Sequence, residues 1–159
     1  MLKETLLHQF GVCYDQNEWF VAIKNAVDGL TAEEAAWKPA GTEHSIWELV
    51  NHLSHDNNSL LHRVLGVEYG SPAANNDETF FSPSGSWAAD LERFEAIMTR
   101  WRDLLEIIDD AKLAERVPPR NELAEIEIAN MNAHNAYHGG QILLIRKLQG
   151  AWDPQNGVS

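Results

Sequence analysis

The sequence has little cysteine and no long hydrophobic run. Its single cysteine, Cys13, cannot form a disulfide within the chain, which suits a reducing compartment. The longest apolar runs, such as residues 142–145, span only a few positions, whereas a transmembrane helix needs about 20. The first residues also lack the apolar stretch of a secretory signal. We therefore expect a cytoplasmic protein that does not enter a membrane.

Positive charge is also scarce. The chain has 12 Lys and Arg against 24 Asp and Glu, which gives a formal net charge of −12. A surface this acidic repels phosphate backbones and anionic lipid headgroups, so we expect neither nucleic acid nor membranes as partners. The length of 159 residues and the hydrophobic fraction of 44% suit one domain with one core. We expect a single domain over residues 1–159.

Hydrophobic residues recur at helical spacing in four long segments, and no segment alternates apolar and polar residues over the length of a strand. The first segment runs from Leu2 to Gly29, and its stripe contains Cys13, which we interpret as a buried, unreactive thiol. The third segment has the clearest stripe: Trp87, Leu91, Phe94, Met98, Trp101, Leu105 and Ile108. The pattern predicts an all-α protein, a four-helix bundle.

Two helix starts carry a capping-box signature, a Ser or Thr followed three residues later by Glu. Thr31 and Glu34 predict a short helix, and Ser45 and Glu48 predict the start of the second long helix. A glycine ends that helix just before a long connection formed by residues 67–85. Connections of this length are uncommon in compact domains, and we expect this one to cover or line a site.

The fourth predicted helix, about residues 122–149, is polar where a bundle helix should be buried. One face of it reads Leu123, Glu127, Asn130, His134, His138, Gln141, Ile145 and Leu148. Burying an amide or an imidazole without a partner costs about 1 to 3 kcal/mol. Several such groups on one buried face predict a shared partner, either a metal ion or a dense hydrogen-bond network.

His134 and His138 are four residues apart, so both imidazoles lie on one helix face and can reach one ion. A His-x-x-x-His pair also arises by chance. The competing interpretation is a metal-free bundle in which the two histidines pair with Asn130 and Gln141. Two histidines do not make a stable site, so a metal centre needs a third ligand from another helix.

The second helix offers that third ligand. His52 falls on the flank of its apolar stripe, whereas His55 and His62 fall nearly opposite, towards solvent. Asp56, one turn after His52, is either a fourth ligand or the carboxylate that orients a histidine, and the spacing leaves both roles open. We interpret the two remaining histidines as surface residues: His8 and His44.

Two short motifs surround the candidate ligands. They read SIWELVNHL over residues 45–53 and HNAYHGGQI over residues 134–142, with a Trp-Lys-Pro segment before them. In this order the sequence resembles the DinB/YfiT-like superfamily of bacterial proteins. The resemblance implies a four-helix bundle with an unusual connection order, commonly a homodimer, and one divalent metal ion held by His52, His134 and His138.

The resemblance also implies a class of chemistry. Characterised members include metal-dependent transferases that use low-molecular-weight thiols, and isomerases. A divalent ion on three neutral imidazoles keeps its charge and an open position, which lowers the pKa of a bound water or thiol. We expect a thiol S-transferase or a hydrolase acting on a small molecule, with zinc or nickel as the ion. Gln141 is a candidate for orienting the substrate, and we expect Tyr137 to pack between helices. The alternative is a bundle that binds a metal or a small molecule without turnover.

Overall fold

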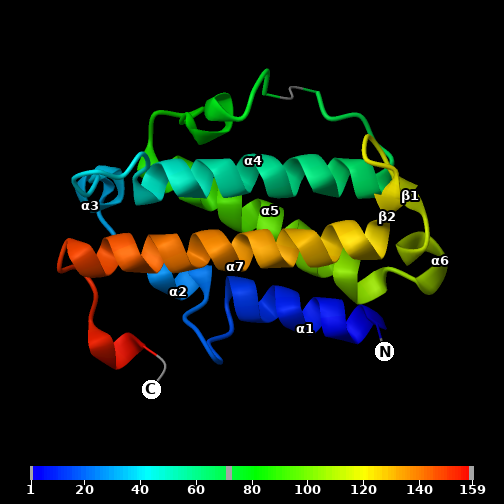
Figure 1. Ribbon diagram of the computed structural model, residues 1–159, viewed down its shortest axis with the longest axis horizontal. Coiled ribbons are helices and arrows are strands. Elements are labelled where there is room, and N and C mark those ends of the chain that lie inside the picture. The colour runs from blue at the N-terminus through cyan, green and yellow to red at the C-terminus, as the bar shows by residue number, and fades with distance from the viewer. Residues whose placement is uncertain (1, 71–72, 158–159) are drawn as a thin grey trace.

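Figure 1 shows the computed structural model, which describes residues 2–70 and 73–157. The long helices are α1 (Leu2–Tyr14), α4 (Ile46–Leu65), α5 (Trp87–Ile107) and α7 (Ala124–Leu148). Shorter elements connect or follow them: α2 (Ile23–Val27), α3 (Ala32–Ala36), η1 (Asp77–Phe80), α6 (Asp110–Leu113), β1 (Arg116–Val117), β2 (Glu122–Leu123) and η2 (Pro154–Asn156). Within the described residues the strands amount to one antiparallel pair, so the predicted all-α class is confirmed.

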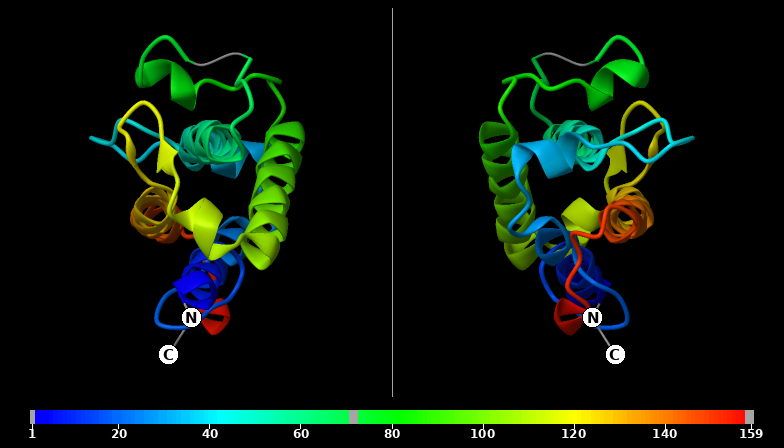
Figure 2. Two further views of the ribbon diagram at one scale, coloured as in Figure 1. Left: turned by 90° about the vertical axis from the view of Figure 1, so that its right-hand side faces the viewer. Right: turned by 90° about the vertical axis from the view of Figure 1, so that its left-hand side faces the viewer.

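The four long helices pack in a closed ring in which α1 contacts α7, α7 contacts α4, α4 contacts α5 and α5 contacts α1 (Figure 2). The connections from α1 to α4 and from α5 to α7 therefore join opposite corners of the ring. Helices α4 and α5 run parallel, since Trp47 packs on Trp87 near their starts and Trp101 donates to the Asn57 carbonyl further along. This is an unusual connection order for a four-helix bundle.

Parallel neighbours explain the long connection after α4. The chain must travel back along the bundle before α5 begins, and it does so over the outer face of α4 (Figure 1). On the way, η1 packs on α4 and buries Thr79 and Phe80. The predicted connection therefore covers α4.

The predicted helix starts of α3 and α4 are confirmed. Thr31 accepts from the backbone N–H of Glu34, and the Glu34 carboxylate accepts from the Thr31 N–H in return. Ser45 and Glu48 form the same pair of bonds at the start of α4. These bonds satisfy helix-start N–H groups that have no partner within the helix.

The predicted length of the first helix is wrong, because the helix ends at Tyr14 and helical structure resumes only at α2. Asp15 forms a two-point ion pair with Arg102 of α5, with N–O distances of 2.7 and 2.8 Å. Asn17 Oδ1 then accepts from the Ala22 N–H at 2.9 Å, just before α2. These contacts stabilise a turn where the apolar spacing favours helix, and Phe20 is left 38% exposed.

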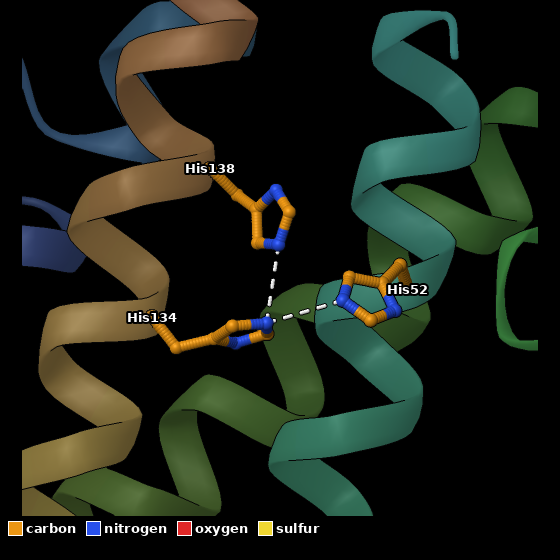
Figure 3. Close-up of side chains that lie close together, drawn as sticks. All are labelled: His52, His134 and His138. Atoms are coloured by element: carbon orange, nitrogen blue, oxygen red, sulfur yellow. Dashed lines mark hydrogen bonds between the residues drawn. The ribbon is translucent and has the colours of Figure 1, made fainter. Parts of the chain in front are cut away.

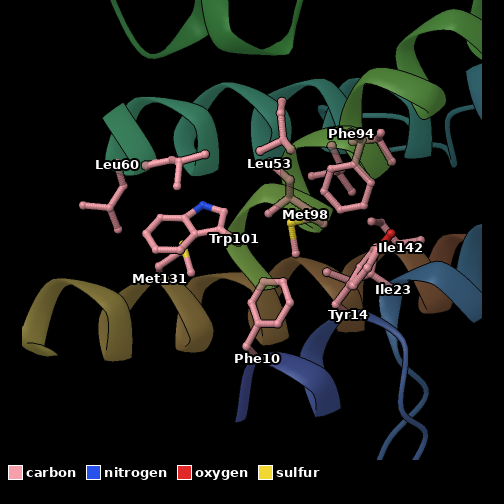
Figure 4. Close-up of a cluster of buried hydrophobic side chains, with 14 of the residues drawn as sticks. Phe10, Tyr14, Ile23, Leu53, Leu60, Phe94, Met98, Trp101, Met131 and Ile142 are labelled. Carbon is pink, nitrogen blue, oxygen red and sulfur yellow. The ribbon is translucent and has the colours of Figure 1, made fainter. Parts of the chain in front are cut away.

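The core lies between the four long helices, and residues from all four contribute to it. Figure 4 draws part of this cluster and labels ten of its members: Phe10, Tyr14, Ile23, Leu53, Leu60, Phe94, Met98, Trp101, Met131 and Ile142. Cys13 is buried and its Sγ donates to the Asn132 carbonyl at 3.2 Å. Burial raises the pKa of this thiol to about 11, which fits the predicted unreactive role. In the described part of the chain, no helix is long and apolar enough to span a membrane.

Candidate metal centre

Three histidine side chains meet between α4 and α7. His52 extends from α4, and His134 and His138 extend from α7 towards it (Figure 3). The Nε2 atom of His134 lies 3.1 Å from Nε2 of His52 and 3.1 Å from Nε2 of His138. One ligand atom from each residue lies within 4.8 Å of the others. The structure thus brings together the three histidines of the two sequence motifs.

A pair of buried amides holds α4 and α7 in register beside this cluster. Asn57 Nδ2 donates to Asn135 Oδ1 at 2.8 Å, and Asn135 Nδ2 donates to Asn57 Oδ1 at 3.0 Å. Both side chains are fully buried. The residue spacing of α7 does not predict this pair: it places Asn130 on the buried face, whereas Asn130 is exposed. Helix α7 is oriented so that Asn132 and Asn135 face inward.

The connection after α4 orients His52. Its Nδ1 lies 2.7 Å from Thr79 Oγ1, and that hydroxyl donates its hydrogen to the Asn76 carbonyl at 2.6 Å. The Thr79 oxygen can therefore only accept from His52, so the His52 proton sits on Nδ1. The Nε2 atom of His52 is therefore unprotonated, and its lone pair faces His134. This tautomer is the one that binds a metal through Nε2.

His138 is oriented in the same way from its own helix. Its Nδ1 donates to Gln141 Oε1 at 2.6 Å, so its Nε2 is also unprotonated and carries a free lone pair. The Gln141 amide in turn donates to the Tyr137 hydroxyl at 3.3 Å. Tyr137 is 64% exposed, so the expected packing of Tyr137 between helices is wrong. Gln141 contacts the histidine cluster rather than lying free beside it.

The three nitrogen atoms cannot satisfy one another. His52 and His138 both present lone pairs, and His134 can supply one proton on Nε2 at most. Burial lowers the pKa of His134 and of His138, and it lowers the pKa of His52 to about 4 against the opposing effect of the nearby Asp56 carboxylate. All three imidazoles are therefore neutral at pH 7, the state in which histidine binds metals.

The geometry fits a divalent ion. Ligand distances of about 2.0 to 2.1 Å in a tetrahedral site place two nitrogen atoms roughly 3.3 Å apart. The two shortest Nε2 separations here are both 3.1 Å. Neutral imidazoles with oriented lone pairs are the ligands that zinc, nickel, copper and iron accept. The cluster could therefore hold one such ion through His52, His134 and His138.

An aromatic stack supports the buried side of His52. Phe80 of η1 lies parallel to the His52 ring, with centroids 4.4 Å apart, and parallel to the His44 ring at 3.8 Å. The prediction that His44 is an ordinary surface residue is wrong, because the fold places it in this stack. Phe80 comes from η1, which follows α4 after a long connection. The residue spacing around His44 therefore does not predict the stack.

Asp56 faces the same centre from the other side. Its Oδ2 atom lies 3.5 Å from His52 Nε2 and 3.8 Å from His134 Nε2. Its Oδ1 accepts from His55 Nδ1 at 3.1 Å, and His55 Nε2 accepts the Ala73 N–H. The predicted solvent-facing position of His55 is wrong, since His55 links Asp56 to the connection above α4. Both roles considered for Asp56, as a ligand or as an orienting carboxylate, are compatible with these distances.

The centre is open to solvent from the groove between α4 and α7. The side chain of His134 is 33% exposed. A pocket of about 300 Å³ includes His134 and Asp56 in its wall. A second pocket of about 300 Å³ lies beyond His138, where Gln141, Leu144 and Leu148 line it. A small molecule can therefore approach the histidines without a change of fold.

Comparison with known proteins agrees with the motifs. A family model described as the DinB superfamily matches residues 22–142, about three quarters of the chain, and this range includes all three histidines. No curated protein and no solved structure matches the chain.

Proposed function

The chain belongs to the DinB superfamily, and on this basis we propose that it is a metal-dependent enzyme of the thiol S-transferase or hydrolase type. The observation that carries the proposal is the set of three Nε2 atoms at a common centre, with the Nδ1 protons of His52 and His138 held by Thr79 and Gln141. A purely structural histidine cluster has no need of lone pairs that face one another.

In this proposal His52, His134 and His138 hold one divalent ion, with zinc or nickel as the expected metals. Bound there, the ion supplies positive charge that lowers the pKa of a thiol or a water towards neutrality. Asp56 lies close enough to accept the proton that such a group loses, and His55 keeps its carboxylate in place. Phe80 excludes water from the buried side of His52.

A second candidate follows from Asp56. If its carboxylate is a fourth ligand, the centre is closed, and the protein is a metal-binding bundle without turnover. The distances from Asp56 Oδ2 to two of the imidazoles, 3.5 and 3.8 Å, favour this reading as much as the first. The two candidates differ in whether an external thiol or water can reach the ion.

Metal analysis and a ligand titration test the proposal. We expect about one divalent ion per chain in the untagged, purified protein by elemental analysis, and less than a tenth of that after reconstitution contradicts the metal centre. Cobalt-loaded protein is then titrated with thiols while its visible spectrum is recorded. A shifted band at millimolar thiol supports the transferase. A band that does not change with thiol but changes with pH, as hydroxide replaces water on the cobalt, supports the hydrolase. A band that no added ligand changes supports the closed centre.

We also propose the homodimer that the family resemblance implies. Apolar and small residues follow each other along the outer face of α7 at three- and four-residue steps, and all are exposed: Ala133, Tyr137, Gly140, Leu144 and Leu148. Small residues let two helix backbones approach closely, and the flanking leucines supply apolar contact area. Light scattering after gel filtration gives the mass, and Leu144→Lys is expected to shift the dimer to monomer.

A further inference from the structure

The pocket beside His134 contains two arginines in a chain that has few. It lies in the groove between α4 and α7 and measures about 300 Å³. Asp56 and His134 form its end at the histidine cluster, and Arg63, Arg120 and Glu127 lie in its wall. We call this space the arginine pocket. Any molecule that reaches the histidines from this side of the groove passes these three charged side chains.

Arg63 lacks a carboxylate partner in the described structure. Its Nη1 donates to the Pro118 carbonyl at 3.1 Å, and its Nε is buried without a hydrogen-bond partner. The chain has twice as many acidic as basic residues, so a half-buried arginine left without a carboxylate is unexpected. Nη1 is bonded to Pro118 and Nε is out of reach of solvent, so Nη2, together with the charge of the guanidinium, is the group that can bind a carboxylate oxygen.

The acidic residues of the pocket face groups other than Arg63. Asp56 points to the imidazoles and accepts from His55. Glu127, which is almost fully buried, lies 3.5 Å from Arg120 Nε. Among the described residues neither one forms an ion pair with Arg63, although both line the same pocket. One guanidinium therefore remains available for an anion that enters from solvent.

We propose that Arg63 binds a carboxylate of the substrate, so that the thiol used by this protein carries a carboxylate at some distance from its sulfur. The inference rests on the proposed thiol chemistry and names the class of thiol. Arg63 follows Asp56 by seven residues, which is about two helical turns or roughly 10 Å along α4. A peptide-sized thiol spans this distance between sulfur and carboxylate, whereas a two-carbon thiol does not.

A matched pair of probes tests the proposal: glutathione and its diethyl ester. They have the same thiol and nearly the same size, and only glutathione carries carboxylates. In cobalt-loaded wild-type protein we expect glutathione to shift the visible band with a Kd about tenfold or more below that of the ester. The net charge of the protein, −12, favours the less negative ester, so such a preference needs a local cation.

Three variants locate the cation. Arg63→Gln is expected to remove the preference and give both probes the ester's affinity, and Arg63→Lys to keep part of it, because an ammonium keeps the charge but not the planar geometry of the guanidinium. Arg100→Gln is the control, since this exposed arginine of α5 has the same charge and donates only to Asn58 at 3.5 Å. It should bind both probes like wild type, and cobalt content and melting temperature verify that each variant is folded and loaded.

The outcomes separate this proposal from the one that it rests on. Equal affinities of wild type for the two probes, or a preference that survives in Arg63→Gln, overturn the carboxylate site and leave thiol binding intact. If neither probe shifts the band at millimolar concentration, the thiol transferase is wrong and the carboxylate site with it, and the hydrolase and the closed centre are left. If Arg63→Gln does not fold, the wild-type comparison and Arg63→Lys decide the matter.

Discussion

Two polar clusters lie at the same interface between α4 and α7, and they differ in whether their polar groups all find hydrogen-bond partners within the protein. In the Asn57–Asn135 pair each amide donates to the other, and Asn57 also donates to the Leu53 carbonyl. In the histidine cluster the lone pairs of His52 and His138 both face His134, which has one proton to offer at most.

This difference separates structure from function within one interface. Buried polar groups whose bonds are all made within the protein specify the register of two helices and need nothing else. The histidine cluster is oriented from outside by Thr79 and Gln141, and in the proposed function its three Nε2 atoms bind an external partner, the metal ion. The predictions below test whether the two clusters have these separate roles.

The largest effect is expected from the ligands themselves. His134→Ala and His52→Ala should each lower metal affinity roughly a thousandfold, because a site worth about 10 kcal/mol or more loses one of its three ligands. Competition with a chromogenic chelator measures the affinity. A His134→Ala protein that keeps stoichiometric metal through dialysis shows that the ion, if any, binds elsewhere.

Acid should weaken the metal-free protein through the histidine cluster and not through the amide pair. The pKa of His52 is about 4 in the folded state and about 6.5 in the unfolded state, so the unfolded chain takes up its proton first as the pH falls. Unfolding free energy should therefore decrease from pH 6.5 to pH 4, by about 3 kcal/mol, and gain nothing from this residue above pH 7.

Urea titrations of wild type and His52→Gln across this range isolate the effect of His52, since other titrating groups are common to both proteins. Asn57 and Asn135 do not titrate, so a variant of that pair should lose stability equally at every pH. Parallel curves for wild type and His52→Gln would show that His52 is not held neutral by the fold.

Breaking the amide pair should cost stability and leave the metal in place. Asn57→Leu or Asn135→Leu strands one buried amide, and we expect a loss of about 2 kcal/mol in unfolding free energy. The double variant should recover part of this loss, because no amide is then left without a partner. Urea unfolding and metal analysis on the same samples check both halves. A single variant that loses its metal while folded contradicts the separation of roles.

The groups that orient the histidines should have intermediate effects. Thr79→Val keeps the shape of the side chain and removes the acceptor for His52 Nδ1, which should lower metal affinity about tenfold. Thr99→Val is the matched control, since Thr99 is exposed on α5 and its hydroxyl bonds only to the Glu95 carbonyl. Equal metal affinities for the two variants would mean that Thr79 does not set the tautomer.

The smallest effect distinguishes two neighbouring histidines of α4. His55→Ala frees Asp56 from one bond and should change metal affinity by less than about threefold. His62→Ala should change nothing, since His62 bonds to the Asn58 carbonyl away from the centre. A loss in His55→Ala as large as in His52→Ala would place His55 among the ligands.

Local features of the chain could be predicted without the structure. The capping boxes at Thr31 and Ser45, the apolar stripe of α5 and the spacing of His134 and His138 depend on residues within one or two helical turns. The same holds for the position of His52 on the flank of α4. Neighbours this close are related by helix geometry alone, which is why all-α class and the three candidate ligands follow from the amino-acid sequence.

The features that the sequence did not predict, or predicted wrongly, depend on contacts between distant segments of the chain. Thr79 reaches His52 across 27 residues, and Asn57 meets Asn135 across 78. The rotation of α7 that buries Asn135 and exposes Asn130 is set by packing against α1 and α4, and a small turn about the helix axis exchanges which polar residues face inward. The sequence by itself determined which residues could bind a metal. Only the tertiary structure decided which hydrogen bond fixes the tautomer of His52, which aromatic ring stacks on it and which arginines line the neighbouring pocket, because these contacts join residues far apart in the chain.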